Sequence, residues 1–289
     1  MREKNKDYSV LMSVYVKERP AFLRESIQSV YDQTVKTNDF VLVCDGELNG
    51  ELEMVIDEMR AKFGKRMTIL RLAQNCGLGV ALRYGVRKCK NELVMRMDSD
   101  DVAKKDRAEK QLAAFNSMDV DVVGSNVIEY DIKMEIVMDK KVVPEKHNDI
   151  VEMLRFRNPF NHMSVMFRKN KVLAAGNYVE MPFFEDYYLW ARMAKGGCKF
   201  FNLQECLVKV RGGIEMTSRR GGVKYLMHNV RFQRALRENG TIDITTMVTN
   251  VVKRSVVALM PNALRARVYS RFLRNSDPEE VKLEEENES

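Results

Sequence analysis

The first 120 residues alternate short apolar runs with stretches of helical periodicity, and this alternation limits the possible folds more than any other feature of the chain. The apolar runs predict strands at 8–16, 40–44, 67–71 and 92–97. The periodic stretches between them predict helices at 20–33, 50–63 and 79–89. Strands that alternate with helical crossovers form βαβ units. The sequence therefore predicts an α/β protein with a Rossmann-like, mostly parallel central sheet flanked by helices.

The pattern changes after residue 120, where the apolar runs become longer and lie closer together. Residues 119–143 predict two strands joined by a polar connection, which is typical of antiparallel pairing. Further elements are predicted as a helix near 148–155, a strand at 162–168, a helix at 185–194 and strands near 198–211. We expect this second half to add a small antiparallel portion to one continuous domain.

Composition excludes several classes of protein. No apolar run approaches the length of a membrane-spanning helix, and the N-terminus lacks the apolar region of a signal peptide. The five cysteines form no C-x-x-C pair, and there are only three histidines, so neither a zinc ribbon nor a multi-histidine metal site is expected. Reduced, buried thiols in a cytosolic protein are the expected state of the cysteines.

The strongest local signal for chemistry is Asp98-Ser99-Asp100-Asp101, directly after the fourth predicted strand. Ligands of such sheets bind at the carboxyl ends of the strands. Three carboxylates so close together repel one another unless a cation lies among them, and their oxygens suit Mg²⁺ or Mn²⁺. The alternative is a solvated acidic turn that caps the next helix.

The second and third predicted strands also end in residues suited to ligand binding. Asp45 can accept from a nucleobase N–H or a ribose hydroxyl, although Asp-Gly is also an ordinary turn. Asn75 precedes Gly77 and Gly79 at the start of a helix, where backbone N–H groups favour anions. The third glycine of G-x-G-x-x-G and a Walker lysine are missing, so neither a dinucleotide site nor a P-loop is predicted.

Charged groups in the second half offer two further candidates. Glu185 and Asp186 stand among aromatic residues, where a partly desolvated carboxylate can act as a general base. Their alternative role is to place favourable acids at a helix N-terminus. Arg211, Arg219 and Arg220 lie in a Gly-rich segment that suits a diphosphate, or they belong to a flexible solvated loop.

Taken in order, these segments resemble glycosyltransferase family 2, the inverting enzymes of the GT-A fold. The resemblance covers about residues 8–220 and is strongest to the bacterial enzymes that build capsule, exopolysaccharide and O-antigen repeat units. Its motifs are SVLMSVYVKERPAFLRESIQSVYDQT, FVLVCDG, QNCGLGVALRYGV, VMRMDSDD with the downstream DRAEKQ, NPFNHMSVMFRK and FFEDYYLWARM. One departure is Cys44, where many relatives carry an acid.

The resemblance implies roles for individual residues. The implied donor is a nucleotide-diphospho-sugar, with UDP the expected nucleotide, and its expected contacts are Ser13, Tyr15, Asp45, Asn75, Arg83, Asp98, Arg211, Arg219 and Arg220. Asp98 and Asp100 are implied ligands of Mn²⁺ or Mg²⁺, and Asp186 is the implied catalytic base with Glu185 beside it. His162 and Trp190 are expected at the acceptor, with a hydrogen-bonded core histidine as the alternative for His162.

The resemblance, the glycines at 212–213 and the shift in charge after them predict a domain organisation. We expect a GT-A catalytic domain over 1–212, with a nucleotide-sugar half at about 1–120 and an acceptor half at about 121–212. A basic loop and amphipathic C-terminal helices are expected over 213–276, followed by an acidic, disordered tail at 277–289.

The charge layout bears on partners and location. The net charge is +7, and residues 207–276 carry fourteen Lys and Arg against three acids. Amphipathic helices over 241–275 favour an anionic membrane surface, with packing on the catalytic domain as an equal alternative. No nucleic acid is expected as a partner, because few aromatic residues lie among the basic ones. The expected location is cytoplasmic, at the inner face of the membrane.

The expected activity is sugar transfer from a nucleotide-diphospho-sugar to a hydroxyl of a glycan or lipid-linked oligosaccharide, in bacterial surface polysaccharide synthesis. A catalytically inactive nucleotide-sugar-binding protein and a sugar nucleotidyltransferase are the alternatives. The intact acids Asp98, Asp100 and Asp186 argue against the first. The loop after the first predicted strand has no glycine, which argues against the second.

Overall fold

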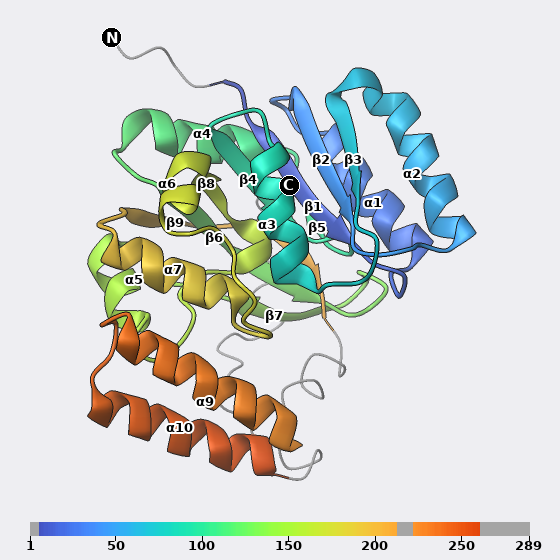
Figure 1. Cartoon of the computed structure of the whole chain (residues 1–289). Helices are drawn as coiled ribbons and strands as arrows, with labels where there is room; N and C mark the ends of the chain where they lie inside the picture. Colours follow the sequence, from blue (N-terminus) through green and yellow to red (C-terminus); the bar gives the residue numbers. More distant parts are fainter. Residues whose placement is uncertain (1–5, 213–221, 261–289) are drawn as a thin grey trace.

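The strands predicted in the first half form the parallel part of a central sheet in this computed structural model, which describes residues 6–212 and 222–260 (Figure 1). Their spatial order is β3-β2-β1-β4, and each neighbouring pair is parallel. The predicted elements are confirmed to within a few residues: β1 (Ser9–Val14), α1 (Pro20–Tyr31), β2 (Asp39–Cys44), α2 (Gly50–Phe63), η1 (Gly64–Arg66), β3 (Met67–Arg71), α3 (Leu78–Lys88) and β4 (Leu93–Met97).

The second half extends the same sheet in the order β4-β8-β6-β9-β5, with β7 on β6. The pairs β4–β8, β6–β8, β6–β7 and β5–β9 are antiparallel, which confirms the expected antiparallel portion, while β6–β9 is parallel. The elements are β5 (Val102–Ala103), α4 (Arg107–Ser117), β6 (Val122–Tyr130), β7 (Val137–Lys141), α5 (His147–Met153), η2 (His162–Ser164), β8 (Met166–Arg168), α6 (Lys169–Ala174), α7 (Glu185–Lys195) and β9 (Phe200–Arg211).

The strand predicted at 162–168 is wrong in its first half. Residues His162–Ser164 form a short 3₁₀ turn, and the strand begins only at Met166. The turn forms because the Ser164 Oγ atom bonds the Ser125 and Asn161 carbonyl oxygens, at 3.1 and 2.9 Å. A local side-chain bond of this kind competes with strand pairing.

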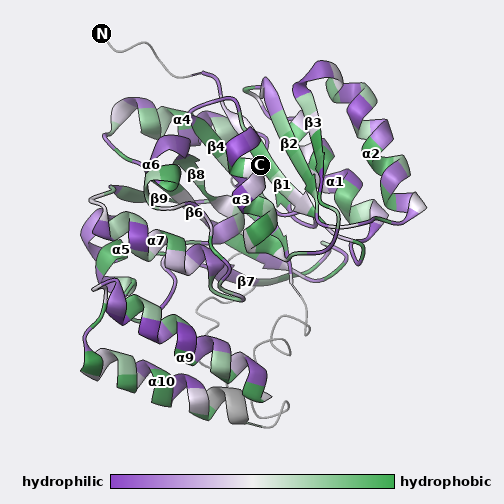
Figure 2. Ribbon diagram, in the orientation of Figure 1, coloured by the Kyte–Doolittle hydropathy of each residue, from purple (hydrophilic) through white to green (hydrophobic). Residues whose placement is uncertain are grey.

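Two hydrophobic cores cover the two faces of the sheet, as Figure 2 shows by the hydrophobic residues gathered along the strands. The core beneath α1, α2 and α4 receives Leu93, Met95 and Met97 from β4. The other core, beneath α3 and α7, receives Val94. Because side chains alternate across a strand, Arg96 points to the same face as Val94 and therefore towards α7.

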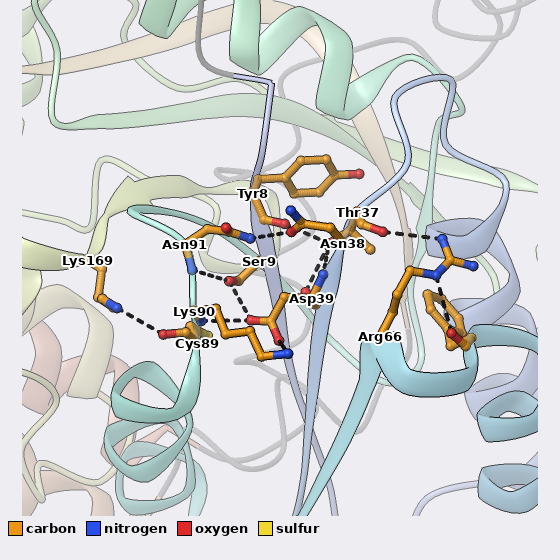
Figure 3. A network of polar contacts seen from close by, with 11 residues as sticks. Tyr8, Ser9, Thr37, Asn38, Asp39, Arg66, Cys89, Lys90, Asn91 and Lys169 are labelled. Atoms are coloured by element: carbon orange, nitrogen blue, oxygen red, sulfur yellow. Dashed lines mark hydrogen bonds and ion pairs between the residues drawn. The ribbon is translucent and has the colours of Figure 1, made fainter.

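The amino ends of the parallel strands are tied by a buried polar network (Figure 3). The Asp39 carboxylate accepts from the Ser9 hydroxyl at 2.7 Å and from the Lys90 backbone N–H at 2.8 Å. The Lys90 ammonium lies 3.7 Å from it, and the Asn91 N–H donates to Ser9 Oγ. These bonds join β1, β2 and the turn before β4.

Two C-terminal helices, α9 (Gly222–Glu238) and α10 (Ile244–Leu259), form a hairpin beside α7 (Figure 1). Phe232 of α9 stacks on Phe184 just before α7, with ring centroids 4.4 Å apart. No helix in 6–212 or 222–260 has the length and apolarity needed to cross a bilayer. The second helix expected after Pro261, most of the basic loop and the acidic tail lie outside the described residues.

Candidate active site

Three carboxylates meet at the carboxyl end of β4, as the sequence predicts. One oxygen from each of Asp98, Asp100 and Asp101 lies within 4.8 Å of the others. Burial, the Asp98 carboxylate and the Glu18 carboxylate raise the pKa of Asp100 to about 7. Burial and the charges of Asp100 and Asp98 raise the pKa of Asp101 well above its usual range. A hard divalent cation fits this set, because it supplies the positive charge that the crowded oxygens need.

Arg211 donates hydrogen bonds to two residues of this acidic cluster. Its Nε donates to the Asp100 carbonyl oxygen at 2.7 Å, and its backbone N–H donates to Asp101 Oδ1 at 3.0 Å. Its Nη2 pairs with Glu25 of α1, and its guanidinium covers the Phe22 ring. The Arg211 side chain is only 3% exposed. In this structure it shapes the acidic loop instead of offering a free guanidinium to a diphosphate.

Glu185 and Asp186 form a second acidic pair in the first turn of α7. The Asn158 side-chain amide donates to Asp186 Oδ2 at 2.6 Å and fixes that carboxylate. Burial followed by the Asp186 charge raises the pKa of Glu185 to about 7, and burial raises the pKa of Asp186. A carboxylate with a raised pKa in a fixed orientation has the properties of a general base.

Arg96 of β4 is a fully buried cation between the two acidic groups. Its side chain is 1% exposed, and its Nη2 donates to Asp98 Oδ1 at 2.5 Å. The charge of Arg96 also acts on the titration of Glu185 and Asp186. The metal-suited cluster and the base-suited pair therefore share one guanidinium.

Asp45, directly after β2, binds the loop that follows β3. Its two carboxylate oxygens accept from the backbone N–H groups of Cys76 and Gly77, at 2.7 and 2.9 Å. Gly46 makes this possible, because a Cβ atom there would lie 2.7 Å from the Asn75 nitrogen. The buried Asp45 thus holds the loop that presents Asn75, and its expected contact with a nucleoside stays a prediction.

The start of α3 brings this loop close to the acidic pair. A Cβ atom added at Gly79 would lie 3.0 Å from Glu185 Cβ, so glycine allows α3 to approach α7. Arg83 and Asn75 are exposed, and Ser13 and Tyr15 are half-buried at the end of β1. Their expected donor contacts stay predictions, and Arg219 and Arg220 lie outside the described residues.

The two residues expected at the acceptor lie deeper than the sequence suggests. The His162 Nε2 atom lies 2.9 Å from the Tyr178 hydroxyl oxygen, and burial followed by the Arg96 charge lowers the pKa of His162 well below its usual range. His162 is thus the neutral, hydrogen-bonded histidine of the alternative. Trp190 is fully buried against Phe160 and His162, and its expected contact with an acceptor stays a prediction.

Sequence reasoning missed Arg96, Glu18, Asn158 and the buried Arg107 of α4. Arg107 donates to the Arg96 carbonyl oxygen at 2.7 Å, and burial followed by the Arg96 charge lowers its pKa to about 9. The signal for Arg96 was present: it is a charged residue within an otherwise apolar strand. The other three lie within quoted motifs of the resemblance, but they come from separate loops and helices, and nothing in the motifs indicates that they meet the acids.

Known proteins share this chain's sequence pattern over most of its length. The family model described as Glycosyl transferase family 2 matches residues 9–173. The UDP-Gal:alpha-D-GlcNAc-diphosphoundecaprenol beta-1,3-galactosyltransferase of Escherichia coli is 34% identical over 275 residues, which cover 95% of this chain and 99% of the relative. The amylovoran biosynthesis glycosyltransferase AmsE of Erwinia amylovora is 36% identical over 268 residues, which cover 91% and 98%.

The fold has a counterpart among solved structures. The mannosyltransferase PcManGT from Pyrobaculum calidifontis, in complex with GDP-Man and Mn²⁺, matches with a TM-score of 0.60 and 14% identity, covering 97% of this chain and 79% of that chain. At this identity the match speaks for the fold alone, and it confirms the GT-A architecture expected from the sequence. With the family model and two relatives above 30% identity, the chain belongs to glycosyltransferase family 2, a family of transferase enzymes.

Proposed function

We propose that the chain is a metal-dependent inverting glycosyltransferase. Its donor is a nucleotide-diphospho-sugar, with UDP as the nucleotide, and its acceptor is a hydroxyl of a lipid-linked or other glycan in bacterial polysaccharide synthesis. The relatives' names support the donor and acceptor classes, since one is named for UDP-Gal and a diphosphoundecaprenol-linked sugar and the other for amylovoran synthesis. The single observation that carries the proposal is the pairing of two acidic groups, on β4 and α7, around Arg96.

The two acidic groups divide the chemistry between them. Asp98 and Asp100 would hold Mn²⁺ or Mg²⁺, which when bound stabilises the negative charge of a departing nucleoside diphosphate. Asp186, fixed by Asn158, accepts the proton of the acceptor hydroxyl. As that oxygen bonds to the anomeric carbon from the side opposite the diphosphate, the bond from this carbon to the diphosphate oxygen breaks. One proton goes to Asp186, the nucleoside diphosphate leaves, and the anomeric configuration inverts.

A panel of nucleotide-sugars tests the proposal directly. The full chain should be heat-stabilised by one nucleotide-sugar in the presence of Mn²⁺ and should transfer that sugar or hydrolyse it slowly. The stabilisation should disappear with EDTA. A protein that binds a nucleotide-sugar but neither transfers nor hydrolyses it would instead be the inactive binding protein.

We also propose that α10 rests on an anionic membrane surface at the inner face of the cytoplasmic membrane. Four apolar side chains four residues apart, Ile244, Val248, Val252 and Val256, are 48–56% exposed and share one face of this helix. Helix α10 has no acidic residue, and the exposed Lys253 and the exposed arginines Arg231, Arg234 and Arg237 of α9 add positive charge. Apolar insertion together with attraction to anionic lipid is how such helices bind membranes.

Vesicle binding tests this surface with a matched pair of variants. Val248→Asp with Val252→Asp should lower binding to phosphatidylglycerol vesicles by about tenfold or more. The variant loses the methyl groups that would insert into the bilayer, and it adds negative charge that anionic lipid repels. Thr245→Asp with Thr249→Asp adds the same charge to exposed positions beside the stripe and should weaken binding less. Equal losses in the two variants would show that charge alone attracts the helix, and no loss in either would reject the surface.

A further inference from the structure

Burial of the Arg96 guanidinium without a full set of hydrogen bonds destabilises the fold. The structure gives a partner to Nη2 only, and the Nε and Nη1 atoms are buried without a hydrogen-bond partner among the described residues. Each unpartnered buried donor destabilises a fold, and an apolar side chain of similar volume often packs with greater stability at such a site. A stability role therefore does not account for the guanidinium.

The surroundings of Arg96 indicate what it acts on. Asp98 lies in direct contact, and the charge of Asp186 on α7 acts on Arg96 through space. The Asp98 side chain is 30% exposed and so retains an open side. The acidic cluster thus has a resident positive charge on its buried side and faces solvent through Asp98 on the other.

A resident cation changes how the cluster binds a metal. A divalent ion that binds alone must approach the guanidinium charge in a region of low dielectric constant, which opposes binding. When the ion binds together with a diphosphate, the negative charge of the diphosphate offsets the positive charge of the ion. This argument rests on the metal site of the proposed function. We propose that the charge of Arg96, held against Asp98, makes tight binding of the divalent metal depend on the donor diphosphate.

The test measures Mn²⁺ affinity, without any assay of activity. Free Mn²⁺ is followed by electron paramagnetic resonance during titration of the full chain, for wild type, Arg96→Met and Arg96→Lys. Arg96→Met removes the charge that contacts Asp98, leaves Arg107 in place, and should bind Mn²⁺ alone about tenfold more tightly, a gain of about 1.4 kcal/mol. Arg96→Lys keeps the charge and should stay within about threefold of wild type. Equal or weaker Mn²⁺ binding by Arg96→Met overturns the proposal.

The second part of the test repeats the Mn²⁺ titration in the presence of a nucleoside diphosphate. UDP, or GDP if UDP does not bind, should raise the Mn²⁺ affinity of the wild type, and this coupling should shrink about tenfold in Arg96→Met. Undiminished coupling in Arg96→Met contradicts the proposal. If neither nucleotide affects Mn²⁺ binding by wild type, the donor assignment of the proposed function fails, while the comparison with Mn²⁺ alone still decides the role of Arg96.

Folding and site identity are controlled separately. Circular dichroism and thermal unfolding establish that each variant is folded, and Arg96→Gln, neutral but polar, replaces Arg96→Met if the latter does not fold. Asp100→Ala should lose Mn²⁺ binding altogether. If Asp100→Ala binds Mn²⁺ like wild type, the metal site itself is misplaced, an outcome distinct from failure of the Arg96 proposal.

Discussion

Buried acids have different surroundings at the two ends of the same parallel strands. At the amino ends, one acid, Asp39, accepts from the Ser9 hydroxyl and the Lys90 N–H through Oδ2, and the Lys90 ammonium lies 3.7 Å from Oδ1. At the carboxyl ends, five acids from the loop after β4 and from α7 gather near the buried Arg96, and the pKa values of Asp100 and Glu185 rise to about 7 through burial and neighbouring charge.

This difference distinguishes an acid that stabilises the fold from acids that are suited to binding a ligand. Where a single acid is hydrogen-bonded and lies near an ammonium, the carboxylate joins strands and adds stability. Where acids outnumber donors, the fold carries an electrostatic cost that a bound cation or a transferred proton can remove. The surplus of acids therefore marks the end of the sheet where chemistry takes place.

The largest effect is expected from Asp186→Asn. Loss of the base should lower kcat by about a thousandfold, within the range attributed to general bases. Donor binding in the presence of metal should stay within about threefold, because Asp186 lies on α7 and not in the metal-suited cluster. The comparison pairs single-turnover transfer with calorimetric donor binding, and an equal loss in both would remove Asp186 from the role of base.

A smaller loss is expected from Asp100→Ala. Removal of one metal ligand should weaken metal-dependent donor binding by about a hundredfold, as does loss of comparable charge-assisted contacts. Donor affinity measured against Mn²⁺ concentration gives the answer. A response to Mn²⁺ identical to that of wild type would place the metal elsewhere.

The pH dependence should report the buried pair directly. A base accepts a proton only when ionised, and burial raises the pKa of Asp186, so kcat/KM should fall on the acid side at a pH above the ordinary aspartate pKa of 3.8. The decline should be about tenfold per pH unit. Asn158→Ala removes a hydrogen bond that lowers this pKa, and it should move the acid limb to higher pH. A limb that stays in place or moves down contradicts the assignment.

The smallest effect on catalysis is expected at the other end of the strands. Asp39→Ala should leave kcat of the folded enzyme within about twofold, while it lowers the free energy of unfolding by about 1–3 kcal/mol because the Ser9 hydroxyl and the Lys90 N–H lose their acceptor. Urea unfolding and steady-state kinetics on the same sample measure both. If kcat fell as far as in Asp100→Ala, the two ends of the sheet would not be separate in function.

Much of the site could be predicted from local sequence. Asp98 and Asp100 follow an apolar strand, and Glu185 and Asp186 open a helix, so pattern and strand-end position identify them. Arg211 shows the limit, because a Gly-rich neighbourhood suggests a free loop while the fold engages its guanidinium at Asp100, Glu25 and Phe22. Trp190 shows the same, since its aromatic character says nothing about which side of α7 faces the core.

The sequence by itself determined the βαβ order, the family and the acids at the strand ends, because these depend on periodicity and on short motifs. Only the tertiary structure decided that Arg96 stands near two acidic groups that lie 84 and more residues apart in the chain. The same holds for Asn158, which fixes Asp186, and for Asp45, which holds the loop of Asn75. Such pairings depend on which face of a strand meets which helix, and that is settled when the sheet closes and the two cores pack.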